Sequence, residues 1–168
     1  MGHRDYVVES YRMCFIVTSD SVYKGLKDDD VKPIVNSVPI LCKGALVSTY
    51  TVVPNDVREI QRRVVECTAR CDVIVVTGGT GISRRDVSVE SVREIALKEL
   101  PGFGELFRLL SHREVGAAAY LSRATAYIVK DSIVFIVPGN PNAVKFALSE
   151  IICKLAPHAV YELKRQLE

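Results

Sequence analysis

The stretch VVTGGTGISRRD, residues 75–86, combines residue types that suit the binding of an anion. Gly78, Gly79 and Gly81 surround Thr80 directly after a β-branched run. Glycine adopts positive φ without strain, so such a turn can point successive backbone N–H groups at a phosphate or carboxylate. A side chain at Gly79 would then crowd the bound anion. Because a plain strand-to-helix turn needs only one glycine, we favour an anion-binding loop.

Charged side chains follow this loop at Arg84, Arg85 and Asp86. Arginine binds phosphate oxygens with two parallel hydrogen bonds. Three roles are open for Asp86: it pairs with an arginine, caps the next helix, or holds Mg²⁺ against a triphosphate. A second turn, VPGNPNAV, leaves an apolar run through a glycine and begins a helix at Asn140. Two such turns at one end of a sheet would suit a ligand with phosphates at both ends.

Neither of the two common nucleotide-binding motifs is present. A P-loop requires G-x-x-x-x-G-K-[ST], and the chain has no such run. The G-x-G-x-x-G fingerprint fails because Gly79-Thr80-Gly81 continues as Ile82, Ser83 and Arg84. The loop is therefore predicted to bind an anion in some other way.

The chain has five cysteines, and none of them forms a C-x-x-C pair. Cys67 and Cys71 could share one face of a helix and a metal ion, but no histidine lies near to complete a tetrahedral set. Unpaired cysteine packs as a small hydrophobic residue. We therefore expect free thiols in or near the core at Cys14, Cys42, Cys67, Cys71 and Cys153.

Strands and helices are expected to alternate along most of the chain. The expected strands cover residues 13–19, 45–53, 72–77, 124–130 and 133–139, the last two forming a hairpin. The expected helices cover 34–44 with a break or kink at Pro39, 55–70, 88–100 with Ser88 as N-cap, 102–113, and a last region that begins at Pro141. This order predicts an α/β fold, a three-layer α/β/α sandwich with a mainly parallel sheet and one antiparallel excursion.

Length and composition fit one domain over residues 1–168, with residues 1–12 as an N-terminal extension that could be flexible. The hydrophobic content of 48% and charged content of 25% are ordinary for a globular protein. A net charge of +2 gives no argument for nucleic acid or a membrane surface. No apolar run approaches the ~18 residues that span a bilayer, and no signal peptide is evident. We expect a cytoplasmic protein with small-molecule partners, no nucleic acid and no membrane.

Four motifs together resemble the MoaB/MogA family of molybdenum cofactor biosynthesis proteins, which is related to the G domain of gephyrin. They are TSDS, TGGTGISRRDVSVESV, LPGFGELFR and VPGNPNAV, and the resemblance runs from about Met13 to Ala156. It implies a molybdopterin adenylyltransferase, which transfers AMP from Mg-ATP to the terminal phosphate of molybdopterin and releases pyrophosphate. It also implies the fold of that family and a homotrimer or hexamer.

The resemblance assigns catalytic roles to Asp86, which would also hold Mg²⁺, and to Asp56. It assigns substrate binding to the early S-D, the glycine loop, the G-F-G-E motif and the second turn. Those binding residues are Ser19, Asp20, Gly78, Gly79, Thr80, Gly81, Arg85, Glu105, Pro138, Gly139 and Asn140.

Two positions depart from the family pattern. Ser21 stands where the family usually has arginine, and the D-x-S-G that often follows is absent. Asn55 stands where the family has the aspartate of V-P-D, so Asp56 would have to replace that carboxylate from the next position. One residue on a helix is a rotation of roughly 100°.

Two other functions are therefore considered. The first is a molybdopterin-binding protein with little or no adenylylation, which Ser21 and Asn55 favour. The second is a nucleotide hydrolase like CinA, which carries a similar domain. The sequence argues against the second, because the G-x-E-L-L typical of CinA is missing from the first loop and no second domain follows.

Overall fold

The computed structural model describes residues 6–165, and over that range six strands form one sheet in the order β2-β1-β3-β6-β5-β4. β1 pairs in parallel with β2 and β3, and β3 pairs in parallel with β6. β5 pairs antiparallel with both β6 and β4. The bounds are β1 (Tyr11–Thr18), β2 (Ala45–Val53), β3 (Val73–Thr77), β4 (Lys98–Leu100), β5 (Thr125–Val129) and β6 (Ser132–Val137). The prediction of a mainly parallel sheet with one antiparallel part is confirmed.

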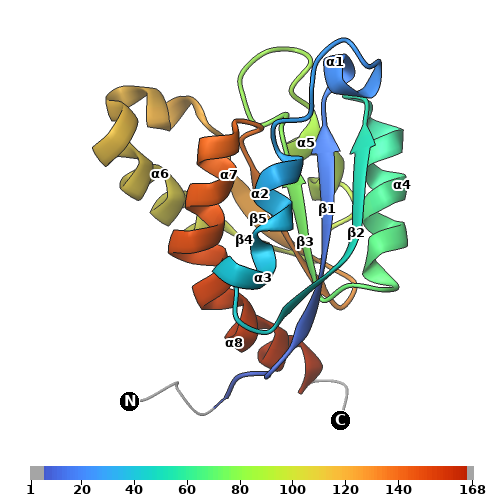
Figure 1. Cartoon of the computed structure of the whole chain (residues 1–168), viewed down its shortest axis with the longest axis vertical. Coiled ribbons are helices and arrows are strands. Elements are labelled where there is room, and N and C mark those ends of the chain that lie inside the picture. Colours follow the sequence, from blue (N-terminus) through green and yellow to red (C-terminus); the bar gives the residue numbers. More distant parts are fainter. Residues whose placement is uncertain (1–5, 166–168) are drawn as a thin grey trace.

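Helices cover both faces of this sheet, as Figure 1 shows. They are α1 (Asp20–Tyr23), α2 (Lys32–Asn36), α3 (Val38–Leu41), α4 (Val57–Thr68), α5 (Ser88–Arg93), α6 (Pro101–Val115), α7 (Pro141–Ala147) and α8 (Cys153–Lys164). A 3-10 helix, η2 (Gly116–Leu121), follows α6, and a π-helical turn, η3 (Leu148–Ile152), joins α7 to α8. No helix within residues 6–165 combines the length and apolar character of a membrane span.

The core is divided into two apolar clusters by the sheet. Successive residues of a strand point to opposite faces of the sheet. Phe15 of β1 belongs to the cluster under α2, α3, α6, α7 and α8. The next residue, Ile16, belongs to the cluster under α4 and α5. Phe135 and Ile136 of β6 are divided in the same way. This division explains why the central strands read as continuous apolar runs, and it produces the three predicted layers.

The break expected near Pro39 is confirmed, because residues 34–44 contain the end of α2 and the whole of α3, and Pro39, which has no N–H to donate, lies in the first turn of α3. One predicted helix is wrong in detail. The helix predicted for 88–100 ends at Arg93, and Lys98–Leu100 form the edge strand β4 instead. Pairing with β5 outweighs the helix propensity of this segment. Ser88 is the first residue of α5 and not its N-cap, since its hydroxyl lies 3.3 Å from the hydroxyl of Thr18.

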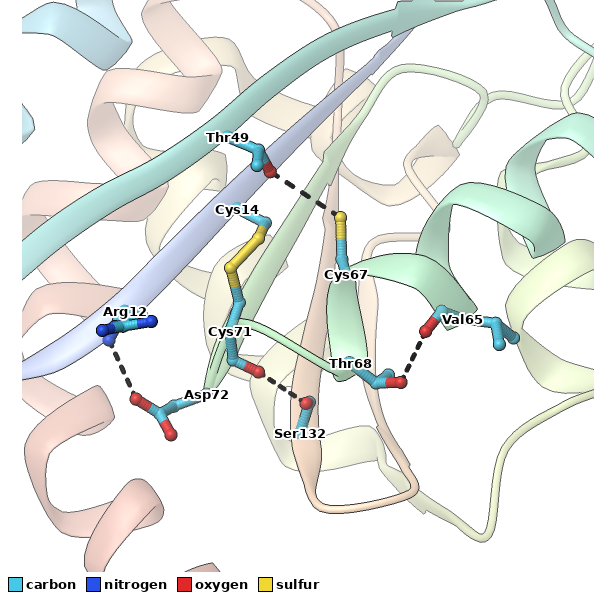
Figure 2. The surroundings of a disulfide bond; sticks show 9 residues. All are labelled: Arg12, Cys14, Thr49, Val65, Cys67, Thr68, Cys71, Asp72 and Ser132. Atoms are coloured by element: carbon cyan, nitrogen blue, oxygen red, sulfur yellow. Dashed lines mark hydrogen bonds between the residues drawn. A yellow bond between two sulfur atoms is a disulfide. The ribbon is translucent and has the colours of Figure 1, made fainter.

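The prediction of free cysteines is wrong for four of the five. One disulfide joins Cys14 of β1 to Cys71 before β3, and the other joins Cys42 at the end of α3 to Cys153 of α8. Figure 2 shows the first of them, where Ser132 donates a hydrogen bond of 2.7 Å to the carbonyl of Cys71. Cys67 is a buried free thiol, and burial raises its pKa. Partners 57 and 111 residues apart cannot be matched from sequence spacing.

The segment before β1 lies against α8. The N–H of Val8 donates to the carbonyl of Pro157 at 3.1 Å, and the rings of Tyr6 and Tyr161 lie 5.4 Å apart. β1 begins at Tyr11, inside the extension expected over residues 1–12, whose first five residues lie outside the described range.

Candidate active site

The chemically distinctive residues follow the carboxyl ends of the parallel strands. Val17 of β1 pairs with Thr77 of β3, which pairs with Val137 of β6, so these three strands end at one level. Figure 1 shows the arrowheads of β1, β2 and β3 pointing to the end of the molecule where α1 lies. In open α/β sheets this edge is the usual place for a ligand.

The two glycine turns predicted from the sequence touch each other at this edge. Gly78 and Gly79 have φ of 98° and 69°, which glycine adopts without strain. A Cβ added to Gly139 would lie 3.2 Å from the Cα of Gly78, and one added to Gly78 would lie 2.5 Å from the carbonyl oxygen of Thr18. The loop after β3 is therefore wedged between the end of β1 and the turn after β6.

Gly79 has a packing reason that the sequence did not suggest. A Cβ at this position would collide with the hydroxyl of the completely buried Ser88 on α5, while the expected crowding of a bound anion stays a prediction. Glycine at position 79 is therefore required for packing the loop onto α5.

A cavity of about 630 Å³ opens beside the two turns. The predicted residues Gly79, Thr80, Gly81 and Asp86 line it from the loop after β3, and Pro138, Gly139 and Asn140 line it from the turn after β6. The opposite wall comes from α6, η2 and α7, through Phe107, Ser111, Glu114, Val115, Ala118, Ala119, Leu121, Ser122, Asn142, Ala143 and Phe146. A lining that mixes apolar and polar groups is typical of small-molecule sites.

No signal in the sequence predicted that second wall. Phe107 and Ser111 lie one helical turn apart on α6 and read as any amphipathic helix. Arg123 was also not predicted; its guanidinium donates to the carbonyls of Gly81 and Asp86 in the glycine loop, 42 and 37 residues away along the chain. Nothing in the local sequence connects Arg123 with that loop.

Asp86 closes the turn at the end of the glycine loop. Its Oδ2 accepts a hydrogen bond of 2.9 Å from the N–H of Ser83, and its own N–H donates to the carbonyl of Ser83 at 3.1 Å. Within residues 6–165 it forms no ion pair, and α5 has Val87 as its N-cap, without a side-chain hydrogen bond. Of the three roles open for Asp86, ion pairing and helix capping are therefore not observed, while its carboxylate lines the cavity.

A second acidic group lies at the ends of β1 and β2. Oδ1 of Asp20 accepts a hydrogen bond of 2.9 Å from the N–H of Asn55. That bond, with a smaller contribution from the Asn55 side chain and the charges of Lys24 and Arg85, lowers the pKa of Asp20. Asp20 therefore stays ionised at neutral pH, within electrostatic reach of Arg85 from the glycine loop. Ser19 precedes it as the N-cap of α1.

Two other predicted site residues have different surroundings. The carboxylate of Asp56 accepts a hydrogen bond of 3.0 Å from the N–H of Glu59 and caps α4. Capping accounts for this aspartate without any catalytic role. Glu105 is exposed on α6 and does not line the cavity. The roles assigned to these two residues stay predictions.

The sequence predicted Mg²⁺ bound together with a triphosphate. The described residues fit such a site, but not a metal site built from protein ligands alone. No group of three or more His, Cys, Asp or Glu within residues 6–165 could hold a metal ion. Mg²⁺ in nucleotide sites needs only one or two carboxylates, because phosphates and waters complete its shell. Oδ1 of Asp86 takes no hydrogen bond from the described part of the chain, so it could serve as such a ligand.

Comparison with known proteins agrees with this geometry. A family described as a probable molybdopterin binding domain matches residues 14–158. The chain belongs to this family. Molybdenum cofactor biosynthesis protein B of Bacillus subtilis is 39% identical over 125 residues, which cover 73% of this chain and 74% of that protein. The protein of the same name from Staphylococcus carnosus is 44% identical over 118 residues, 69% of each chain.

Solved structures of this molybdenum cofactor biosynthesis family share the fold. The tungsten cofactor synthesizing protein MoaB of Pyrococcus furiosus superimposes with a TM-score of 0.81 at 37% identity, covering 95% of this chain and 98% of that one. A molybdenum cofactor biosynthesis protein B gives 0.85 at 34% identity, covering 94% and 98%. CinA of Thermoplasma acidophilum gives 0.61 at 17% identity over 88% and 97%, a likeness of fold alone.

Proposed function

We propose that this protein is a molybdopterin adenylyltransferase, which transfers AMP from ATP to the terminal phosphate of molybdopterin and releases pyrophosphate. The observation that carries the proposal is the meeting of two glycine turns, at Gly78 and Gly139, beside a cavity of about 630 Å³ that Asp86 lines. In this proposal the pterin occupies the cavity and its phosphate faces the glycine loop. The phosphates of ATP face the corner formed by Ser19, Asp20 and Arg85.

The chemistry is a displacement at phosphorus. An oxygen of the pterin phosphate attacks the α-phosphorus of ATP, the bond from that phosphorus to the bridging oxygen breaks, and pyrophosphate leaves with the electron pair. Such reactions depend on positioning and on neutralising charge. Backbone N–H groups of the glycine loop and the guanidinium of Arg85 would supply both. Mg²⁺, held by Asp86 and phosphate oxygens, would neutralise further charge when bound.

The proposal is tested by two assays on one preparation. Molybdopterin binding is measured by fluorescence titration, and pyrophosphate release is measured with molybdopterin and Mg-ATP. Adenylyltransfer predicts pyrophosphate release that requires both substrates. ATP hydrolysis that proceeds equally without pterin would contradict the proposal and favour the hydrolase.

A molybdopterin-binding protein without transferase activity is the second candidate, and a specific observation favours it. Asn55 occupies the position at which the resemblance expects a carboxylate, and its N–H contacts Asp20. Asp56 is engaged as the N-cap of α4. If wild-type protein binds pterin without turnover and Asn55→Asp gains transferase activity, this second candidate is correct.

We also propose a cytoplasmic homotrimer or hexamer. Several large apolar side chains of α6 and η2 are exposed in the single chain, and burial between copies would remove them from water. They are Leu106, Leu109 and Tyr120. Light scattering after size-exclusion chromatography tests the number of copies, and a monomeric mass would contradict this proposal.

A further inference from the structure

Arg123 holds the glycine loop through three hydrogen bonds to its carbonyls. Its Nε donates to the carbonyl of Gly81 at 2.9 Å, and its Nη2 donates to the carbonyl of Asp86 at 3.0 Å. Its backbone N–H donates to the carbonyl of Thr80, also at 2.9 Å. One residue therefore fixes three carbonyls within the seven residues 80–86, the last of which is Asp86.

The remaining edge of the guanidinium pairs with Glu90 of α5. Burial opposes the ionisation of Glu90, but the hydrogen bond and charge of Arg123 outweigh it, so the pKa of Glu90 is lowered. α5 begins directly after the loop, so this ion pair ties Arg123 to both the loop and the helix that follows. The rigid planar fork of arginine can hold three acceptors in fixed directions, whereas the ammonium of lysine is a point charge on a flexible stem.

Arg123 also connects the two walls of the cavity. It follows η2 and Ser122, and Ala119, Leu121 and Ser122 line the wall opposite to the glycine loop. Thr80, whose carbonyl accepts from the Arg123 backbone, is buried and lines the facing wall. A displacement of Arg123 would therefore change the distance between the two walls and the position of Asp86 together.

We propose that Arg123, supported by Glu90, is a positioning residue of the transfer reaction. It does not line the 630 Å³ cavity, and it acts through the Gly81 and Asp86 carbonyls by holding the Asp86 carboxylate against the substrates. This inference rests on the proposed function for its effect on activity. Its effect on the loop is independent of that function and can be measured separately.

The experiment compares Arg123→Lys and Glu90→Gln with Arg62→Lys as a matched control. Arg62 also bridges carboxylates, those of Glu59 and Glu66, but on the outer surface of α4. Amide hydrogen exchange is followed in peptides that cover residues 79–86, and the kcat and KM of AMP transfer are measured in parallel.

We expect Arg123→Lys to accelerate exchange in residues 79–86 at least tenfold, with exchange in β1 and β6 unchanged. We expect kcat to fall at least tenfold with less than threefold change in the KM for pterin. Glu90→Gln should give a smaller change in the same direction, and Arg62→Lys should give none. In Arg123→Ala, added guanidinium should restore loop protection.

Unchanged exchange in residues 79–86 of Arg123→Lys would overturn the positioning role, whatever the activity shows. Unfolding of both Arg123→Lys and Arg123→Ala would also overturn the positioning role, because Arg123 would then be a general stability residue. If exchange responds as expected and wild-type protein transfers no AMP, the positioning of the loop stands while the proposed function fails.

Discussion

Reduction of the two disulfides should lower the stability of this protein substantially and leave the site intact. In the chain-entropy account, a cross-link stabilises the folded state by restricting the unfolded chain. For separations of 57 and 111 residues, that account gives about 4.2 and about 4.8 kcal/mol at 25 °C. Measured values for such bonds are commonly about 2–4 kcal/mol, and we expect a loss in that range for each bond.

The assay is urea unfolding of the protein with and without dithiothreitol, together with a thiol count after denaturation. The count should give one thiol, that of Cys67, before reduction and five after it. Cys14→Ala/Cys71→Ala and Cys42→Ala/Cys153→Ala separate the two bonds, and the fourfold variant should not respond to dithiothreitol. One partner of each bond precedes a strand, Cys71 before β3 and Cys42 before β2, and none of the four bonded cysteines lines the 630 Å³ cavity. Ligand binding at the carboxyl ends of the strands should therefore persist after reduction.

Either of two results would refute this reasoning. Five reactive thiols in protein denatured without reductant would show that the bonds do not form. An unfolding free energy that dithiothreitol does not change would show that the bonds form but do not stabilise the fold.

Three further predictions concern single carboxylates. Asp86→Asn keeps an oxygen that can accept a hydrogen bond from the N–H of Ser83. Pterin binding should therefore persist while AMP transfer falls by about 10²–10³-fold. Transfer at the wild-type rate would show that Asp86 only stabilises the glycine loop. Asp56→Ala removes the N-cap of α4 and should cost about 0.5–2 kcal/mol of stability in chemical unfolding, and a large loss of kcat in protein of full stability would instead support the catalytic role. Glu90→Gln removes an ion pair whose carboxylate has a lowered pKa, so wild type should be more stable than the variant by at most about 1 kcal/mol at neutral pH. The difference should decrease as the pH falls below the ordinary pKa of 4.5 and through the lowered pKa of Glu90, and a difference that does not decrease in acid would contradict the electrostatic explanation.

The sheet and the two glycine turns were predictable from the sequence because their signals are local. β3 and β6 are short apolar runs that end at glycine or Pro-Gly, and Asn140 caps α7 with a hydrogen bond of 2.8 Å to the N–H of Asn142. The local rule fails where tertiary pairing decides. Lys98–Leu100 have good helix propensity, yet they form an edge strand because β5 offers a free edge.

The candidate site was predictable only on the strand side. The glycine loop and Asp86 are adjacent in sequence, while Arg123, Glu90 and the α6 wall reach them through the fold. The disulfides escaped prediction for the same reason, since an odd number of cysteines at long separations leaves every pairing open. Asp56 has a structural role that the sequence argument did not weigh, because its carboxylate accepts a hydrogen bond from the N–H of Glu59 and caps α4. Its catalytic role stays a prediction.

The most direct test of the adenylyltransferase proposal is a transfer experiment with ATP labelled at the α-phosphate. Wild-type protein is incubated with molybdopterin, Mg²⁺ and labelled ATP, and the pterin fraction is separated and counted. The proposal predicts label in the pterin fraction in equal amount to the pyrophosphate released, and its loss in Asp86→Asn. Bound pterin with no label, in protein that leaves ATP intact, would contradict the proposal and identify a binding protein.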